Sequence, residues 1–158
     1  MKRVSSSPST DPTLADLSPE PEVLVLRRDD LEAIIAQART EYPNEACGLL
    51  GGRGGRVERV YPTRNALNSP VRYRVAEEDL LAALLDMEAR GWGPDPLGIY
   101  HSHPHGPETP SATDVAESFY PDSIYLIVSH VARERPVIRA FRIVEGQVRE
   151  ITVQIVPV

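Results

Sequence analysis

The sequence lacks the features that mark secreted, membrane-spanning and nucleic-acid-binding proteins. Its 158 residues include one cysteine, Cys47, which excludes an internal disulfide and a zinc cage built from several cysteines. No apolar run approaches the roughly 18 residues of a membrane span. A Ser- and Pro-rich stretch follows Met1-Lys2-Arg3, where a signal peptide would be apolar. The net charge is −6 and no basic cluster lies beyond the N-terminus, which argues against nucleic acid as a partner. We therefore expect a soluble, cytoplasmic protein.

Hydrophobic patterns predict an α/β fold of mixed α+β type, in which helices flank a mixed central β-sheet. Residues 1–21 are rich in Ser, Pro and Thr and lack periodicity, so we expect a disordered tail before a single domain of residues 22–158. Helices are expected from Asp29 or Asp30 to Tyr42-Pro43, over 76–90, and from Ser111 to about Phe119. The expected strands are residues 22–27, 44–52, 57–61, 71–75, 96–100, 123–129, 137–144 and 148–156.

The most informative stretch runs from His101 to Asp114 and reads His-Ser-His-Pro-His-Gly-Pro-Glu-Thr-Pro-Ser-Ala-Thr-Asp. His101 and His103 follow an apolar segment at alternate positions, so both imidazoles project to one side if the strand continues through them. Two imidazoles and the Asp114 carboxylate form a donor set that suits Zn²⁺, with the fourth tetrahedral position left for water. The pattern predicts a catalytic zinc site with one ion per chain.

Ser111 and Glu45 are the candidate catalytic residues. Ser111 and Asp114 form a Ser-x-x-acid pattern, which is also a helix-capping signature that needs no metal. The two interpretations are compatible, because a helix cap would hold Asp114 in a fixed orientation as the third ligand. The Ser111 hydroxyl would then donate a hydrogen bond to an anionic oxygen near the metal. Glu45 immediately precedes an apolar strand, where a fixed carboxylate would accept a proton from a metal-activated water.

Three neighbouring residues have competing interpretations. Cys47 would be the nucleophile of a different mechanism, but a lone cysteine inside an apolar strand is typical of inert core. His105 would be a spare metal ligand, although its Gly- and Pro-containing loop favours exposure to solvent. Ser102 lies between the two histidines and would point away from them, where it can form hydrogen bonds behind the ligands.

Together these residues resemble the JAMM motif of the MPN+ (Mov34/PAD-1-like) metallopeptidases, E…H-[ST]-H-P-x6-S-x2-D. Neighbouring sequence segments match the family as well, including Pro43-Asn-Glu-Ala-Cys-Gly-Leu-Leu-Gly51. The likeness covers about residues 23–145. The resemblance implies a cytidine-deaminase-like MPN fold. It also implies roles for five residues: zinc ligands His101, His103 and Asp114, the general base and proton shuttle Glu45, and the oxyanion-stabilising Ser111.

The same resemblance implies a substrate. Members of this family commonly cleave peptide or isopeptide bonds after the C-terminal Gly-Gly of ubiquitin-like proteins, and such a tail could add as a strand to an exposed sheet edge. Only eight residues, 115–122, separate Asp114 from the next expected strand. This leaves little room for the long insertion of linkage-specific eukaryotic relatives, so the chain resembles compact, stand-alone prokaryotic members. Their expected substrates are ubiquitin-like or sulfur-carrier β-grasp proteins.

Other functions remain open at this point. A zinc hydrolase of small amides would use the same ligands, and a non-proteolytic MPN interaction module would lack them. A DNA-associated relative is disfavoured by the acidic charge. A zinc nucleoside deaminase of the usual form needs a Pro-Cys-x-x-Cys segment, which a single cysteine excludes. The oligomeric state, including a homodimer, also remains open.

Overall fold

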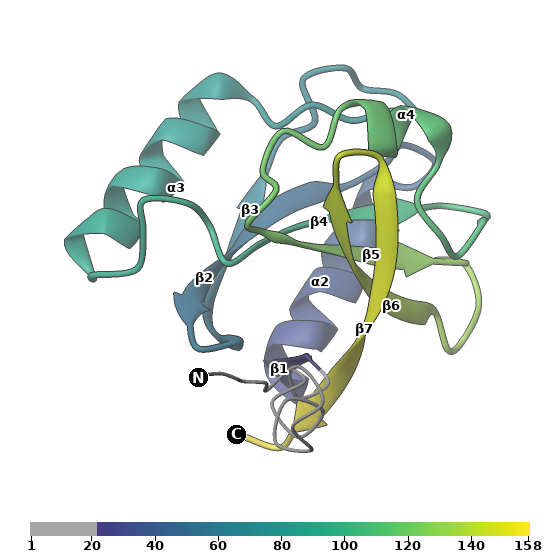
Figure 1. The fold of residues 1–158 in the computed structure, drawn as a ribbon. Helices are drawn as coiled ribbons and strands as arrows, with labels where there is room; N and C mark the ends of the chain where they lie inside the picture. The colour runs from purple at the N-terminus through teal and green to yellow at the C-terminus, as the bar shows by residue number, and fades with distance from the viewer. Residues whose placement is uncertain (1–21) are drawn as a thin grey trace, which may run out of the picture.

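A computed structural model describes residues 22–158, and the expected tail of residues 1–21 lies outside them. Strands and helices alternate irregularly along this part of the chain (Figure 1), as expected for the mixed α/β class. No helix of residues 22–158 is long and apolar enough to cross a lipid bilayer. The elements in order are β1 (Val23–Arg27), α2 (Arg28–Glu41), β2 (Cys47–Arg53), β3 (Arg56–Thr63), α3 (Glu77–Ala89), β4 (Gly98–His103), α4 (Ala112–Ala116), β5 (Ile124–Ser129), β6 (Val137–Val144) and β7 (Gln147–Val156).

The described strands form one mixed sheet in the order β1-β3-β2-β4-β5-β6-β7, which confirms the expected fold class. The pairs β4–β5, β1–β7 and β1–β3 are parallel, and the other pairs are antiparallel. The sheet also closes on itself, which no local sequence pattern predicts. Closure depends on β1, which pairs with β7 along five residues and with β3 only at Val25 and Arg56.

Two apolar clusters lie on opposite faces of the sheet. One surrounds α2 and includes Leu50 and Tyr100, and the other lies against α3 and includes Leu49 and Ile99. Adjacent residues of a strand enter opposite clusters because successive side chains of a β-strand point to opposite faces. β5 is buried along its whole length, as its uninterrupted apolar run predicts.

β4 carries the histidines and runs through the centre of the sheet. The expected strand ends at residue 100, whereas β4 continues to His103, so both histidines lie within a regular strand. His101 pairs with Cys47 of β2 on one side and with Ile127 of β5 on the other. Hydrogen-bonded neighbours on both sides make β4 a rigid support for the two imidazoles.

Three local predictions are wrong. Residues 71–75 form no strand beyond one isolated bridge between Val75 and Asn65, because the Asn65 side chain bonds to the backbone of Arg72 and Arg74 where a neighbouring strand would pair. Helix α2 starts directly after β1, so Asp29 and Asp30 lie in its first turn, where the helix dipole favours acids, and neither is the N-cap. Helix α4 ends at Ala116, before the expected Phe119. There the Ser118 hydroxyl donates a hydrogen bond to a backbone carbonyl of the last turn.

Candidate metal-binding active site

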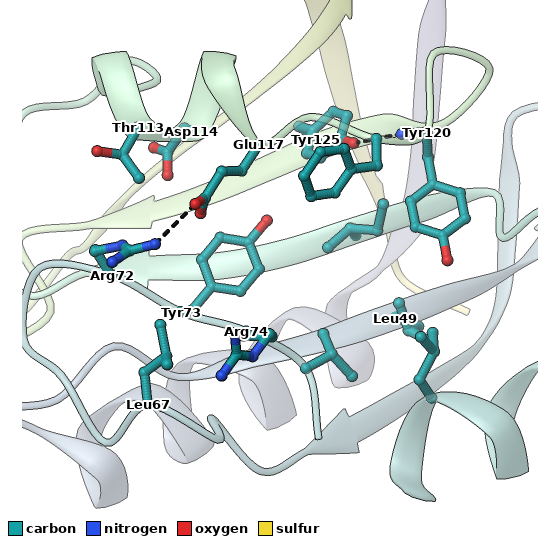
Figure 2. Close-up of a pocket in the computed structure, with 14 residues that line it drawn as sticks. Leu49, Leu67, Arg72, Tyr73, Arg74, Thr113, Asp114, Glu117, Tyr120 and Tyr125 are labelled. Carbon is teal, nitrogen blue, oxygen red and sulfur yellow. Dashed lines mark hydrogen bonds and ion pairs between the residues drawn. The ribbon is translucent and has the colours of Figure 1, made fainter. Parts of the chain in front are cut away.

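The candidate site lies at the edge of a cavity of about 380 Å³ (Figure 2). The cavity is bounded by α4, by the residues just after it, and by the extended segment 71–75 that precedes α3. Its wall is mainly aromatic and aliphatic, with Tyr73 and Tyr125 among the lining residues. Arg72 and Glu117 form an ion pair of 2.7 Å at this cavity, and Asp114 lines it on the side of the histidines.

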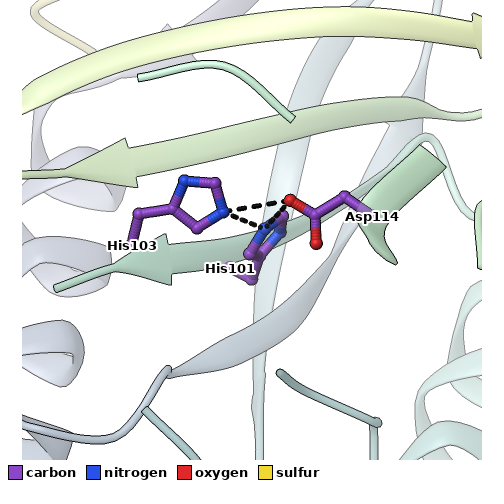
Figure 3. A group of neighbouring side chains, drawn as sticks. All are labelled: His101, His103 and Asp114. Atoms are coloured by element: carbon purple, nitrogen blue, oxygen red, sulfur yellow. Dashed lines mark hydrogen bonds and ion pairs between the residues drawn. The ribbon is translucent and has the colours of Figure 1, made fainter. Parts of the chain in front are cut away.

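Three predicted site residues converge beside the end of β4 (Figure 3). Nε2 of His101 lies 3.1 Å from Nε2 of His103. Oδ2 of Asp114 lies 3.1 Å from the His101 nitrogen and 3.0 Å from the His103 nitrogen. Within residues 22–158, these three form the one group of His, Cys, Asp or Glu side chains close enough to share a metal ion. His105 is outside it, since this exposed histidine instead contacts the Tyr42 hydroxyl at 3.2 Å.

The chemistry of the donor atoms fits a metal cation. Nδ1 of His103 lies 2.6 Å from the Pro107 carbonyl oxygen, which can only accept, so Nδ1 carries a proton and the neutral ring has a lone pair on Nε2. In this neutral form the lone pair faces a carboxylate oxygen of Asp114 at 3.0 Å, and a cation between the two acceptors relieves the repulsion, either a metal ion or, in the metal-free chain, a proton on Nε2. A tetrahedral zinc ion with bonds of about 2.0–2.1 Å holds its ligand atoms about 3.3 Å apart. The observed separations of 3.0–3.1 Å are close to this value.

Burial and hydrogen bonding set the charges of the three donors. Burial alone would raise the pKa of Asp114, but hydrogen bonds from His101, His103 and the Ser111 amide hold it far below its usual range. Burial lowers the pKa of His101 despite the nearby carboxylate. Burial also acts to lower the pKa of His103, but Asp114 and the Pro107 carbonyl outweigh it and raise that pKa. The carboxylate is therefore ionised at neutral pH, and a metal ion would displace the proton that His103 retains.

A capping box at the start of α4 fixes Asp114. The Asp114 amide donates to Ser111 Oγ at 3.0 Å, and the Ser111 amide donates to Asp114 Oδ2 at 2.9 Å. Both hydrogen bonds of the predicted Ser-x-x-acid cap are thus present. Because the Ser111 oxygen acts as an acceptor in the cap, the proton of this hydroxyl stays free to be donated at the site.

Glu45 lies just before β2, beside the histidines. The pairing of β2 with β4 continues past Cys47, since the Ser102 amide donates to the Ala46 carbonyl at 3.0 Å. Ser102 points away from the candidate metal site, as predicted, and its hydroxyl accepts from the Ala46 amide at 2.8 Å. This antiparallel register places Glu45 opposite His103 on the same face of the sheet.

The Glu45 carboxyl group is suited to proton transfer. The residue is 3% exposed, and Oε1 has no hydrogen-bond partner among the described residues. Burial raises the pKa of Glu45 to about 8, although the charge of His103 opposes this shift. A carboxyl group that exchanges its proton near neutral pH, and has a free oxygen, can act as a general base and then as a general acid.

Two residues that no sequence motif marks also lie at the candidate site. The ring of Tyr73 stacks on the imidazole of His101, with centroids 4.4 Å apart and an interplanar angle of 20°. Asn65 is buried and bonds to the backbone of the segment that carries Tyr73. Both lie between β3 and α3, where the sequence predicts a strand over residues 71–75 but no motif marks either side chain.

Cys47 is core, and we expect it to be chemically inert. It is fully buried, its thiol contacts the Thr63 hydroxyl at 3.3 Å, and burial raises its pKa to about 11. Iodoacetamide at pH 8 should therefore leave the native protein unlabelled and its activity unchanged, whereas the denatured chain should gain one label by mass spectrometry. Labelling of native Cys47 with a parallel loss of activity would instead revive the nucleophile interpretation.

Comparison with known proteins places these features in a family. Residues 27–144 match the model of the prokaryotic homologs of the JAB domain. The chain is 41% identical over 136 residues to the CysO-cysteine peptidase of Mycobacterium tuberculosis, covering 85% of this chain and 92% of that protein. It is 39% identical over 126 residues to the probable TtuB-protein conjugate cleaving protease of Thermus thermophilus, covering 79% of each.

Solved structures give the same result for the fold. The solution structure of a protein from Desulfitobacterium hafniense is 40% identical, with a TM-score of 0.75 over 85% of this chain and 92% of that chain. A JAB1/MPN domain protein from Archaeoglobus fulgidus is 17% identical, with a TM-score of 0.54 over 88% of this chain and 99% of that chain. This second likeness concerns the fold alone and agrees with the expected MPN fold.

Proposed function

Because the chain belongs to the family of prokaryotic homologs of the JAB domain, we propose that it is a zinc-dependent metallopeptidase. Its proposed reaction is hydrolysis of a peptide or isopeptide bond after the C-terminal Gly-Gly of a ubiquitin-like or sulfur-carrier β-grasp protein, in the cytoplasm. The convergence of His101, His103 and Asp114 on one point carries the proposal. Relatives named as a CysO-cysteine peptidase and a TtuB-protein conjugate cleaving protease support the substrate class.

In the proposed mechanism, His101, His103 and Asp114 hold one zinc ion per chain. When bound, zinc supplies a Lewis acid that lowers the pKa of water and polarises a carbonyl group. Glu45 accepts the proton of the attacking water and later returns it to the leaving nitrogen. The Ser111 hydroxyl, free to donate beyond the helix cap, stabilises the oxyanion. No covalent bond between enzyme and substrate is required.

The proposed tail binds beside Tyr73. β4 has no free edge, because β2 and β5 cover both of its sides. Segment 72–74 is extended, however, and Asn65 holds the Arg72 carbonyl and the Arg74 amide on one side. Within the described part of the chain, the amide and carbonyl of Tyr73 have no hydrogen-bond partner. A tail paired with these two groups would run along the cavity to Asp114, and glycines at its end would let its backbone approach the metal closely.

Cleavage of defined conjugates tests the function. The zinc-loaded protein of residues 1–158 would be given a β-grasp carrier whose Gly-Gly is followed by one further amino acid, and a carrier joined by isopeptide bond to a lysine peptide. We expect intact-mass spectra to show cleavage after the second glycine, loss of cleavage with chelator, and recovery with zinc. Hydrolysis of an acyl-Gly-Gly anilide without cleavage of either carrier would instead identify an amidase of small substrates. Stoichiometric zinc without any hydrolysis would contradict the peptidase proposal.

A further inference from the structure

We propose that Tyr73 is a positioning residue for the metal site: its ring fixes the His101 imidazole by stacking, and Asn65 holds Tyr73 in place. The inference rests on the proposed function, because it takes His101 as a metal ligand. It adds two residues from a loop that carries none of the motif, and it links the proposed tail-binding segment physically to one ligand.

The two imidazoles are restrained in different ways. His103 is fixed by its second ring nitrogen, which donates to the Pro107 carbonyl at 2.6 Å. His101 has no such restraint, because its Nδ1 is buried without a hydrogen-bond partner among residues 22–158. Metal-binding histidines almost always use this second nitrogen to set the orientation of the ring. The orientation of His101 must therefore come from another contact.

Tyr73 supplies that contact. Its ring lies nearly parallel to the His101 imidazole, with centroids 4.4 Å apart, and so covers one face of it. Rotation of the imidazole about its own χ2 bond would turn its edge into the tyrosine ring, which close packing forbids. The stacked ring therefore keeps Nε2 of His101 directed at Asp114 and His103 without a hydrogen bond to Nδ1.

Asn65 fixes the backbone on both sides of Tyr73. Its Nδ2 donates to the carbonyls of Arg72 and Glu45, each at 3.0 Å. Its Oδ1 accepts from the amides of Arg74 at 3.1 Å and Leu67 at 3.0 Å. The side chain is 7% exposed, and these four bonds use all the hydrogen-bonding capacity of an amide group. This one buried side-chain amide thus hydrogen-bonds to Arg72 and Arg74, on either side of Tyr73, and to the backbone of Glu45, the proposed base.

This arrangement couples substrate binding to the metal. A tail that pairs with the amide and carbonyl of Tyr73 would restrain the backbone whose side chain restrains His101. Loosening segment 72–74 should therefore weaken metal binding even though none of its residues is a ligand. If Tyr73 only lined the cavity wall, its loss would leave metal affinity unchanged. Metal affinity therefore separates a positioning role of Tyr73 from a role in the cavity wall alone.

The test compares three variants for zinc affinity, measured by competition with a chromophoric chelator, and for the visible absorption of bound Co²⁺. Tyr73→Leu removes the ring, Tyr73→Phe keeps it, and Tyr120→Leu removes a second tyrosine that lines the same cavity but does not stack on His101. We expect Tyr73→Leu to raise the zinc dissociation constant about 10-fold or more and to change the Co²⁺ spectrum, as loss of a partner of a metal ligand does. Tyr73→Phe and Tyr120→Leu should match the wild type in both measurements.

The variant Asn65→Asp independently tests whether Asn65 holds Tyr73 in place. Aspartate keeps an acceptor for the Leu67 and Arg74 amides and loses both donors, so zinc affinity should fall in the same direction. The wild-type zinc protein also gives a readout that needs no variant, an NMR nuclear Overhauser effect between the ring protons of Tyr73 and His101. Absence of that signal, or folded Tyr73→Leu with wild-type zinc affinity and Co²⁺ spectrum, would overturn the inference and leave the proposed function intact. A wild-type chain that binds no zinc would overturn both.

Discussion

Replacement of Glu45 by glutamine should abolish turnover, leave zinc bound, and make the metal-free protein more stable. The loss of turnover follows from the loss of the proton acceptor, since general base catalysis contributes about 10²- to 10⁴-fold to a rate. Zinc should remain at one ion per chain because Glu45 is outside the His101–His103–Asp114 group. Opposite effects on activity and stability are expected where catalysis requires an ionisable side chain at a buried position, because that burial lowers stability.

The gain in stability has a defined pH dependence. Burial raises the pKa of Glu45 from 4.5 to about 8 in the folded, metal-free chain, so the folded state binds this proton more tightly than the unfolded state does. Wild-type stability therefore falls as the pH rises from about 4.5 to about 8. Glutamine has no proton to lose, so its advantage should be absent below pH 4.5 and reach up to about 3 kcal/mol near pH 7.

Three measurements check this prediction. Conjugate cleavage gives turnover, metal analysis gives the zinc content, and urea unfolding of chelator-treated protein at pH 4 and pH 7 gives the stability difference. Glu41→Gln is the matched control, because Glu41 is an exposed glutamate at the end of α2 and should change none of the three. Full turnover in Glu45→Gln would remove the proposed base, and an equal stability difference at both pH values would remove its buried, protonated state.

The sheet was predictable where pairing is local and unpredictable where it is not. The apolar run of β5 and the alternating pattern of β7 identify strands directly, and the Glu145-Gly146 turn joins β6 and β7. Closure of the sheet through β1 depends on pairs between residues near 25 and residues near 155, and no local pattern specifies such a contact. Residues 71–75 likewise have the composition of a strand, but their β-pairing is limited to one isolated antiparallel bridge between Val75 and Asn65.

The residues of the proposed site also divide into those that a local sequence pattern identifies and those that depend on distant contacts. His101 and His103 were predictable as a pair because a strand has a period of two, and Ser111 with Asp114 because a capping box has fixed spacing. Glu45 could be named from its position before an apolar strand and from the resemblance, whereas its place opposite His103 depends on the β2–β4 register. Asn65 and Tyr73 were missed because side chain–backbone bonds and ring stacking within a loop have no sequence period.

The three histidines of His-Ser-His-Pro-His provide the second large prediction. They alternate along the chain, but β4 ends at His103, and Pro104 and Gly106 follow, so only the first two face Asp114. His103→Ala should abolish activity and weaken zinc binding well beyond the roughly 10- to 100-fold that follows loss of a ligand's hydrogen-bond partner. His105→Ala, which removes an exposed ring bonded to Tyr42, should keep both zinc and activity.

Thermal unfolding with and without zinc checks this pair of variants without any substrate. A ligand that binds only the folded state at 100 times its dissociation constant adds about 2.7 kcal/mol of stability, so zinc should raise the melting temperature of the wild type and of His105→Ala. His103→Ala should melt at the same temperature with and without zinc, because one donor of the group is gone. If zinc stabilised His103→Ala and failed to stabilise His105→Ala, the ligand set would be wrong although the fold is right. If it stabilised none of the three proteins, the convergence of His101, His103 and Asp114 would need an explanation other than a metal ion.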